Sequence, residues 1–201
     1  MRKGIAMIKI GLTGSIGMGK TTTANMFKEL GCPVFDADKA VHRLYDKGGA
    51  AVPLIKAAFP DAVKEGRVDR QALGAHMRAD PLNLPVLESF VHPLVAGVRT
   101  AFLEAALEHK AKIVVFDVPL LFETGGEAYV DKIAVVTAPA HIQRKRVLAR
   151  PGMTADLFEK LLSRQMPDFE KRNRADFLIF TDKGLDYARE QVQSIIIELS
   201  R

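Results

Sequence analysis

The sequence predicts an α/β protein in which helices cover both faces of a parallel β-sheet. Several short apolar runs lack the alternation of half-exposed strands and have the composition of strands buried on both faces. Amphipathic helical patterns separate most of them, and strands that alternate with helices form right-handed βαβ units. A glycine-rich segment follows the first run directly, at the edge of the sheet where such folds bind ligands.

Five strands are expected, of which the second is the weakest because it is short and is placed mainly by the glycine before it and the acidic turn after it. They are Met7–Thr13, Pro33–Phe35, Ile113–Asp117, Ile133–Val136 and Phe177–Phe180. The expected helices of the core and its C-terminal half have apolar residues at helical spacing, and Gly31 ends the first of them. They are Thr21–Leu30, Ile142–Ala149, Leu157–Gln165 and Leu185–Leu199.

The stretch from residue 37 to residue 110 interrupts this alternation. It contains no convincing strand, only helical segments such as Asp69–Met77, for which Asp69 is the expected N-cap. Pro93 lies inside the helical pattern Leu84–Glu108, so a kink or break is expected there. We interpret the stretch as a helical insertion between the second and third strands.

Composition indicates the cellular compartment of the protein and the charge of its binding partner. The net charge of +5 favours an anionic partner, namely polyphosphate, nucleic acid or an acidic lipid surface. Cys32 is the only cysteine, so no internal disulfide forms. The start at Met1 is charged, but Lys9 interrupts its apolar run too early for a signal peptide, and translation could equally begin at Met7. No apolar stretch reaches the roughly 20 residues of a membrane helix, so a cytoplasmic protein is expected.

The segment from Gly14 to Thr21 matches the phosphate-binding pattern G-x-x-x-x-G-K-[ST]. Its glycines let successive N–H groups point at phosphate oxygens, and the following helix offers its N-terminal N–H groups to the same anion. Lys20 can reach the β- and γ-phosphates, and the Thr21 hydroxyl can ligate Mg²⁺. The pattern predicts a P-loop NTPase three-layer sandwich that binds ATP. The expected nucleotide contacts are Gly14, Ser15, Ile16, Gly17, Met18, Gly19, Lys20, Thr21, Thr22 and Arg150.

Other P-loop classes fit less well. A GTPase needs an Asn-Lys-x-Asp motif after a late strand, and the corresponding segment from Phe180 to Gly184 lacks it. Mechanical ATPases and helicases are usually longer than 201 residues. A small-molecule kinase is the leading class.

Acidic residues follow two of the predicted strands. Asp36-Ala37-Asp38 ends the second strand on the same edge as the phosphate loop. A carboxylate there can accept the proton of an attacking hydroxyl or help to hold Mg²⁺, but the same residues suit an N-cap, and both interpretations stay open. Asp117 ends the third strand and is either a Walker B carboxylate that supports Mg²⁺ or a cap in a turn.

Positive charge concentrates between residues 144 and 174. Arginine forks suit the charge that spreads over a transferring phosphoryl group, and Arg150-Pro151-Gly152 breaks two helices as a mobile lid requires. Two or three of these side chains are expected to touch phosphate, and the rest to be solvated. Aromatic residues are not interleaved with the charges, which disfavours nucleic acid, and the histidines lack metal-ligand spacing.

The chain resembles the dephospho-coenzyme A kinase family over nearly its whole length. The phosphate loop is generic, whereas the order of the other segments is specific to the family. They are Asp36-Ala37-Asp38, Gly66-Arg67-Val68-Asp69-Arg70 with Leu73, His92-Pro93-Leu94, Pro119-Leu120-Leu121-Phe122-Glu123, Gln143 with Arg146, Arg150, Gln165-Met166 and Ala175-Asp176.

This resemblance implies transfer of the ATP γ-phosphoryl group to the ribose 3′-hydroxyl of dephospho-coenzyme A, with Mg²⁺. It places the proposed base on Asp38 and a phosphate-binding arginine on Arg146. It also implies one kinase domain with three parts: a core (1–36, 111–139 and 175–201), a helical substrate lobe (37–110) and a lid (140–174). Pro151 after Arg150, and Ser15 and Met18 in the loop, depart from the family's frequent residues.

Two other functions remain open from the residues alone. One is another small-molecule kinase, for nucleoside monophosphates or shikimate-like hydroxyls. The other is a regulatory protein whose partner affinity ATP switches. The acidic turn beside the phosphate loop favours catalysis over binding alone.

Overall fold

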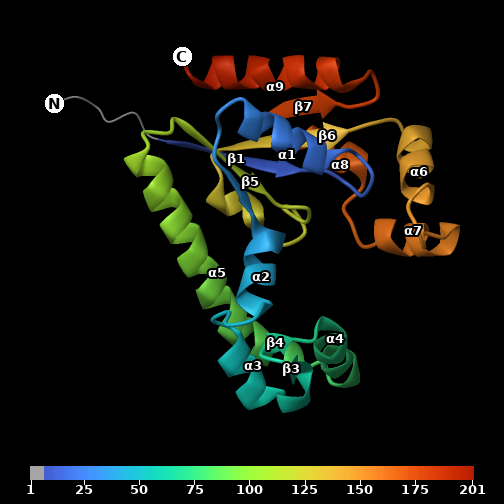
Figure 1. Ribbon diagram of the computed structural model, residues 1–201. Helices are drawn as coiled ribbons and strands as arrows, with labels where there is room; N and C mark the ends of the chain where they lie inside the picture. Colours follow the sequence, from blue (N-terminus) through green and yellow to red (C-terminus); the bar gives the residue numbers. More distant parts are fainter. Residues whose placement is uncertain (1–6) are drawn as a thin grey trace. The chain divides into compact units, whose positions relative to one another are not determined.

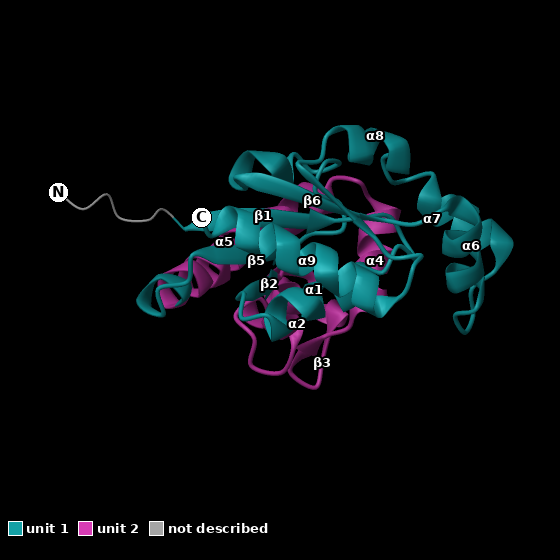
Figure 2. Cartoon of the chain, turned by 90° about the horizontal axis from the view of Figure 1, so that it is seen from above, with its two compact units in different colours: residues 1–35, 106–201 teal, residues 36–105 magenta. Residues whose placement is uncertain are grey.

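The computed structural model describes residues 7–201, and the predictions about the charged start at Met1 fall outside that range. The chain forms two compact units, residues 1–35 with 106–201 and residues 36–105 (Figure 2). Each unit has its own apolar core.

The first unit is built on a sheet of five strands in the order β2-β5-β1-β6-β7. The pairs β1–β5, β1–β6 and β6–β7 are parallel, with Leu12 opposite both Asp117 and Ala134. Because these strands run in the same direction, the loops that follow them leave from one edge of the sheet. The strands are β1 (Ile8–Thr13), β2 (Val34–Asp36), β5 (Ile113–Asp117), β6 (Lys132–Thr137) and β7 (Phe177–Phe180).

Helices cover the sheet as the alternating pattern predicts (Figure 1). Phe27 of α1 and Val192 of α9 are fully buried and share one apolar cluster with Ile10 and Val136 of the sheet. In Figure 1, α6 and α7 extend beyond the end of β6. The helical elements of this unit are α1 (Lys20–Glu29), η2 (Gly126–Tyr129), α6 (Ala140–Leu148), α7 (Ala155–Leu162), α8 (Asp168–Asn173) and α9 (Leu185–Leu199).

The second unit is mainly helical, and its core gathers apolar residues such as Leu44, Ile55, Phe59 and Leu73. Asp69 caps α4 as predicted, since its carboxylate accepts hydrogen bonds from the N–H groups of Gln71 (3.0 Å) and Ala72 (3.1 Å). The elements are α2 (Ala37–Tyr45), α3 (Val52–Ala58), η1 (Pro60–Ala62), β3 (Val63–Lys64), β4 (Arg67–Val68), α4 (Arg70–Ala79) and α5 (Asn83–Glu108), the last of which runs on into the first unit.

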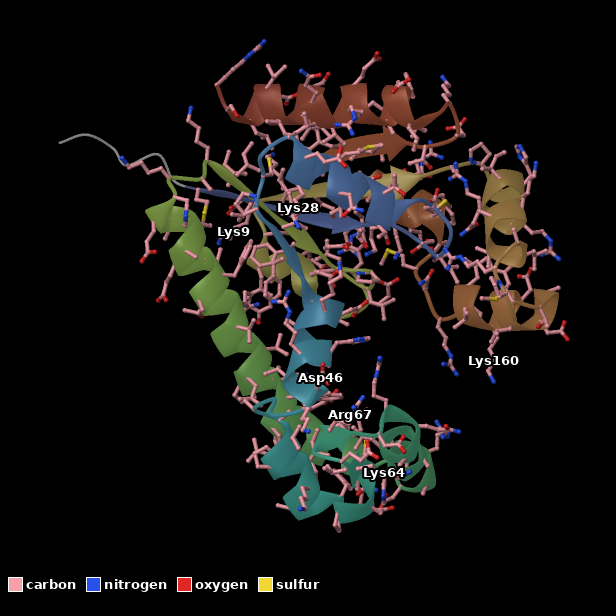
Figure 3. The ribbon with its side chains drawn as sticks, in the orientation of Figure 1. Lys9, Lys28, Asp46, Lys64, Arg67 and Lys160 are labelled. Atoms are coloured by element: carbon pink, nitrogen blue, oxygen red, sulfur yellow. The ribbon has the colours of Figure 1, made fainter. Side chains whose placement is uncertain are left out.

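The antiparallel hairpin of β3 and β4 corrects the expectation that this stretch has no strand. Glu65 (φ 51°) and Gly66 (φ 78°) form its two-residue turn, and two positive φ values in succession are typical of the tight turns that match strand twist. Lys64 and Arg67 flank the turn (Figure 3), and the Lys64 ammonium pairs with the Asp69 carboxylate at 2.6 Å.

Helix α5 differs from two expectations. Of the kink or break expected at Pro93, the break does not occur, because the turns on both sides of the proline keep their hydrogen bonds and the 26-residue helix continues past it. By length and composition alone, the helix could also cross a membrane. The expectation that no apolar stretch of the chain is long enough for this is therefore wrong. Core helices of soluble proteins pass the same test.

Candidate active site

The phosphate loop joins β1 to α1 and has the backbone that its glycines predict. Gly17 (φ 80°) and Gly19 (φ 96°) lie in the left-handed region, and the Met18 N–H donates to the Ser15 carbonyl at 3.1 Å. Helix α1 begins at Lys20, so its first N–H groups, which have no partner within the helix, face the loop. This arrangement is an anion site built from main-chain donors.

Two of the glycines are also required by close packing. A Cβ atom at Gly14 would lie 2.6 Å from the Val136 carbonyl oxygen of the neighbouring strand. A Cβ atom at Gly17 would lie 2.4 Å from a methyl group of Val147 on α6. The loop therefore packs directly against the sheet and against the first helix of the Arg-rich segment.

Lys20 and Asp117 are brought together at the edge of the sheet. Asp117 ends β5, and its carboxylate forms an ion pair with the Lys20 ammonium. The two side chains are only 16% and 8% exposed, so water screens their attraction weakly. The structure thus places the loop lysine beside the carboxylate that the sequence singled out at the end of the third predicted strand.

Three threonines follow Lys20 in the first turns of α1, and they have different surroundings. Thr21 and Thr22 are exposed, whereas Thr23 is buried and its hydroxyl donates to the Gly19 carbonyl at 3.2 Å. Thr21 and Thr22 are therefore accessible to solvent at the start of the helix that follows the loop.

Arg146 is held at the loop through Thr181. Its guanidinium donates to the Thr181 hydroxyl (2.8 Å) and carbonyl (2.6 Å), and the same hydroxyl donates to the Met18 carbonyl (2.8 Å). Thr181 directly follows β7, so these bonds connect α6, the phosphate loop and the end of the last strand. Sequence reasoning missed Thr181, because a single threonine after a strand carries no signal of its own.

A cavity of about 290 Å³ lies beside the loop. Arg146, Arg150 and Thr22 all line it, so the structure places these three predicted site residues around one cavity. Its full lining is Gly17, Gly19, Thr22, Thr23, Met26, Arg146, Arg150, Thr181, Gly184, Leu185 and Ala188. Polar groups from the loop, the arginines and Thr181 surround an otherwise apolar hollow, the usual composition of a small-molecule site.

The other cations between residues 144 and 174 do not all lie on solvated faces. Arg144 does, pairing with Glu159 on the surface at 2.7 Å. Lys171, in contrast, is fully buried and pairs with the Glu123 carboxylate at 2.8 Å. Burial raises the pKa of Glu123, but the ion pair with Lys171 and the hydrogen bond from the Met166 N–H outweigh it, so the net pKa lies below the usual value.

The acidic turn belongs to the second unit, where its two carboxylates have different roles. Asp36 is the N-cap of α2: it accepts from the Lys39 N–H at 2.9 Å and pairs with the Lys39 ammonium at 2.9 Å. Asp38 lies in the first turn of the same helix and is partly exposed. The cap expected of this turn is therefore Asp36.

Comparison with known proteins agrees with these features. A sequence model of the dephospho-CoA kinase family matches residues 8–186. A protein of Mesorhizobium japonicum named dephospho-CoA kinase is 55% identical over 193 residues, covering 96% of this chain and 97% of its own length.

Solved structures share the fold. The protein TT1252 of Thermus thermophilus superposes with a TM-score of 0.81 at 35% identity, covering 96% of this chain and 98% of that one. The dephospho-CoA kinase of Campylobacter jejuni superposes with a TM-score of 0.70 at 24% identity, covering 96% of each chain, and this likeness supports the fold alone. With the family match spanning most of its length, this chain belongs to the dephospho-CoA kinase family.

Proposed function

We propose that this protein transfers the terminal phosphoryl group of ATP to the ribose 3′-hydroxyl of dephospho-coenzyme A, giving coenzyme A and ADP. The observation that carries the proposal is the phosphate loop with its Lys20–Asp117 pair, in a chain that belongs to the dephospho-CoA kinase family. Phosphoryl transfer depends mainly on positioning and on stabilising negative charge, and the loop supplies both main-chain donors and a cation.

In this mechanism Lys20 and the main-chain N–H groups of Gly17 and of Gly19, Lys20 and Thr21 hold the triphosphate. Binding of the phosphates competes with Asp117 for the Lys20 ammonium, because both partners are anionic. The adjoining cavity of about 290 Å³ takes the nucleoside part of ATP, and Thr22 and Arg150 reach it from different elements. Its volume is near the lower end of the range for small-molecule sites.

Mg²⁺ fits the donors at this place. The Thr21 hydroxyl and the Asp117 carboxylate are hard oxygen ligands, and Mg²⁺ commonly takes its remaining ligands from water and substrate phosphates. The bound ion would neutralise charge on the phosphates. Thr21 and Asp117 are therefore the residues that we assign to metal binding, either directly or through water.

Asp38 is the proposed base. Because Asp36 is engaged as the helix cap with both carboxylate oxygens on Lys39, Asp38 is the better suited of the two acids to accept a proton from the 3′-hydroxyl. Arg146 and Arg150 neutralise the developing charge, and closure of segment 140–174 excludes water, which would otherwise compete as acceptor. The cytoplasm, where ATP and Mg²⁺ are both supplied, is the compartment that we assign to this reaction.

The function is tested by coupling ADP release to a panel of acceptors that includes dephospho-coenzyme A, nucleoside monophosphates and shikimate. We expect turnover with dephospho-coenzyme A alone. ADP release that no acceptor stimulates would instead favour the ATP-switched binder, and a preference for another acceptor would indicate a different kinase.

The base is tested by Asp38→Asn, which should lower kcat by about 10²–10⁴-fold while ATP still binds. Asp36→Asn is the matched control, since it removes a charge from the same turn but keeps a side chain that caps helices well. A larger loss of kcat in Asp36→Asn than in Asp38→Asn would assign the base to Asp36.

The role of Arg150 is tested against Lys160, which also carries one positive charge in segment 140–174. Lys160 is exposed on α7 (Figure 3) and does not reach the cavity. Arg150→Ala should raise the KM for ATP by about tenfold, as the loss of one charged hydrogen bond predicts, and Lys160→Ala should leave it unchanged. Equal effects would mean that overall charge, not the cavity contact, matters.

A further inference from the structure

Two glutamine side chains hydrogen-bond to the main chain of a single residue of the phosphate loop. The Gln143 side-chain amide donates to the Ile16 carbonyl at 2.8 Å. The Ile16 N–H donates in turn to the Gln165 side-chain oxygen at 3.0 Å. The glutamines lie 127 and 149 residues from Ile16 along the chain, on either side of α7. Both main-chain polar groups of Ile16 are therefore held by long-range hydrogen bonds.

Both contacts lie where water competes little. Gln143 is only 5% exposed, and Ile16 and Gln165 are half-buried. A buried main-chain N–H or carbonyl that loses its partner keeps the cost of its desolvation. The backbone at Ile16 is therefore fixed in one orientation, with its N–H directed at Gln165 and so not available to a phosphate oxygen.

The two glutamines are themselves anchored. Gln143 lies one turn before Arg146 on α6, on the same side of the helix. Gln165 precedes Met166, whose N–H donates to the Glu123 carboxylate at 2.7 Å, and Glu123 is fixed by the buried Lys171. The two hydrogen bonds to Ile16 thus connect the phosphate loop to segment 140–174 at two places, Gln143 and Gln165.

We infer that Gln143 and Gln165 are positioning residues that shape the phosphate loop for ATP and tie it to segment 140–174. Neither is assigned a contact with the nucleotide. Their removal lets the backbone at Ile16 rotate, so the following N–H groups no longer converge on the phosphates. The inference deepens the proposed function, and it rests on ATP binding at this loop.

The two glutamines have opposite hydrogen-bonding roles, one as donor and one as acceptor, and this difference can be tested. Gln143 must donate and Gln165 must accept, because their partners are a carbonyl and an N–H of the same residue. Glutamate offers only acceptors when ionised. Gln165→Glu therefore keeps its contact with Ile16, whereas Gln143→Glu turns an attraction into a repulsion between two oxygens.

The experiment compares Gln143→Met, Gln165→Met, the double methionine variant, Gln143→Glu and Gln165→Glu, with Gln193→Met as a control at an exposed glutamine on α9. Binding of a non-hydrolysable ATP analogue is measured by calorimetry, and KM and kcat are measured separately for ATP and dephospho-coenzyme A. Thermal unfolding of each variant verifies that it folds.

Each methionine variant should bind the analogue about twofold to tenfold more weakly, the effect of losing one neutral hydrogen bond. The KM for ATP should rise in parallel while the KM for dephospho-coenzyme A stays the same. Gln143→Glu should bind more weakly than Gln165→Glu, and Gln193→Met should match the wild type. The two methionine changes together should cost less than the product of their separate effects, since both release the same loop residue.

Wild-type affinity in both methionine variants, or a larger loss in Gln165→Glu than in Gln143→Glu, would overturn the inference. If a Gln143 variant fails to fold, Gln165→Met decides alone: it must bind the analogue more weakly than both the wild type and Gln193→Met. Analogue binding needs no acceptor, so a wild type that binds it but does not phosphorylate dephospho-coenzyme A would refute the proposed function and leave this inference standing.

Discussion

The buried pair of Lys171 and Glu123 gives the most quantitative prediction. The Lys171 side chain is 0% exposed and the Glu123 side chain 17%, so the two partners lose different amounts of hydration on folding. Glu123→Gln leaves a buried ammonium without a counter-charge, and breaking a buried pair in this way costs about 3 kcal/mol or more of unfolding free energy. Lys171→Met leaves a carboxylate that keeps some water and the Met166 N–H, so about half that cost is expected.

Thermal unfolding at pH 7 measures the difference. One kcal/mol shifts the Tm of a chain of this size by about 2–4 °C, so Glu123→Gln should lower it by about 6–12 °C and Lys171→Met by about half as much. The double variant should be less destabilised than the sum of the two, because neither charge is then left alone. A larger loss in Lys171→Met, or strict additivity, would refute the argument that the unpaired buried ammonium causes most of the lost stability.

Three further predictions concern other groups. Lys20→Ala should reduce kcat/KM for ATP by at least about 100-fold, since it removes the charged contact to the phosphates. Normal turnover in steady-state kinetics would contradict the assignment of Lys20 to phosphate binding. The pKa values of Glu123 and Asp176 lie below their usual values, because desolvation raises them less than their partners lower them. The stability that these carboxylates provide is therefore full at neutral pH and is lost on acidification below about pH 4. The Tm of Glu123→Gln should fall less steeply with acid than that of the wild type, and parallel curves would show that the pair does not titrate. Burial raises the pKa of Cys32 to about 11, so iodoacetamide at pH 8 should modify the unfolded chain but not the native one, and rapid labelling of the native protein would place Cys32 at the surface.

Much of the first unit could be predicted because its signals are local. The strands β5 and β7 have the bounds that their apolar runs predict, since a strand buried on both faces needs only a short uninterrupted run. The phosphate loop is likewise encoded in a few consecutive residues whose glycines determine the backbone. In the second unit, Asp69 was predictable as a cap for the same reason, because the side chain bonds the N–H groups two and three residues later.

Features that depend on distant partners could not be predicted. Lys171 lies among exposed basic residues in the sequence, and only the fold brings Glu123, far earlier in the chain, beside it. Gln143 and Gln165 carry no sign of their shared contact with Ile16, since polar side chains have no periodic pattern. The hairpin of β3 and β4 was missed because two-residue strands show no alternation, although its Glu65-Gly66 turn was a usable signal.

In the proposed reaction, the γ-phosphoryl group held at Lys20 passes to the 3′-hydroxyl of dephospho-coenzyme A. The most direct measurement uses ATP labelled at the γ-phosphoryl oxygens and locates the label in the product by mass spectrometry and ³¹P NMR. The wild type should give one labelled phosphate at the ribose 3′ position, and Lys20→Ala should give at least about 100-fold less of it in the same time. Label recovered as free phosphate, or at another position of the product, would contradict the proposed reaction.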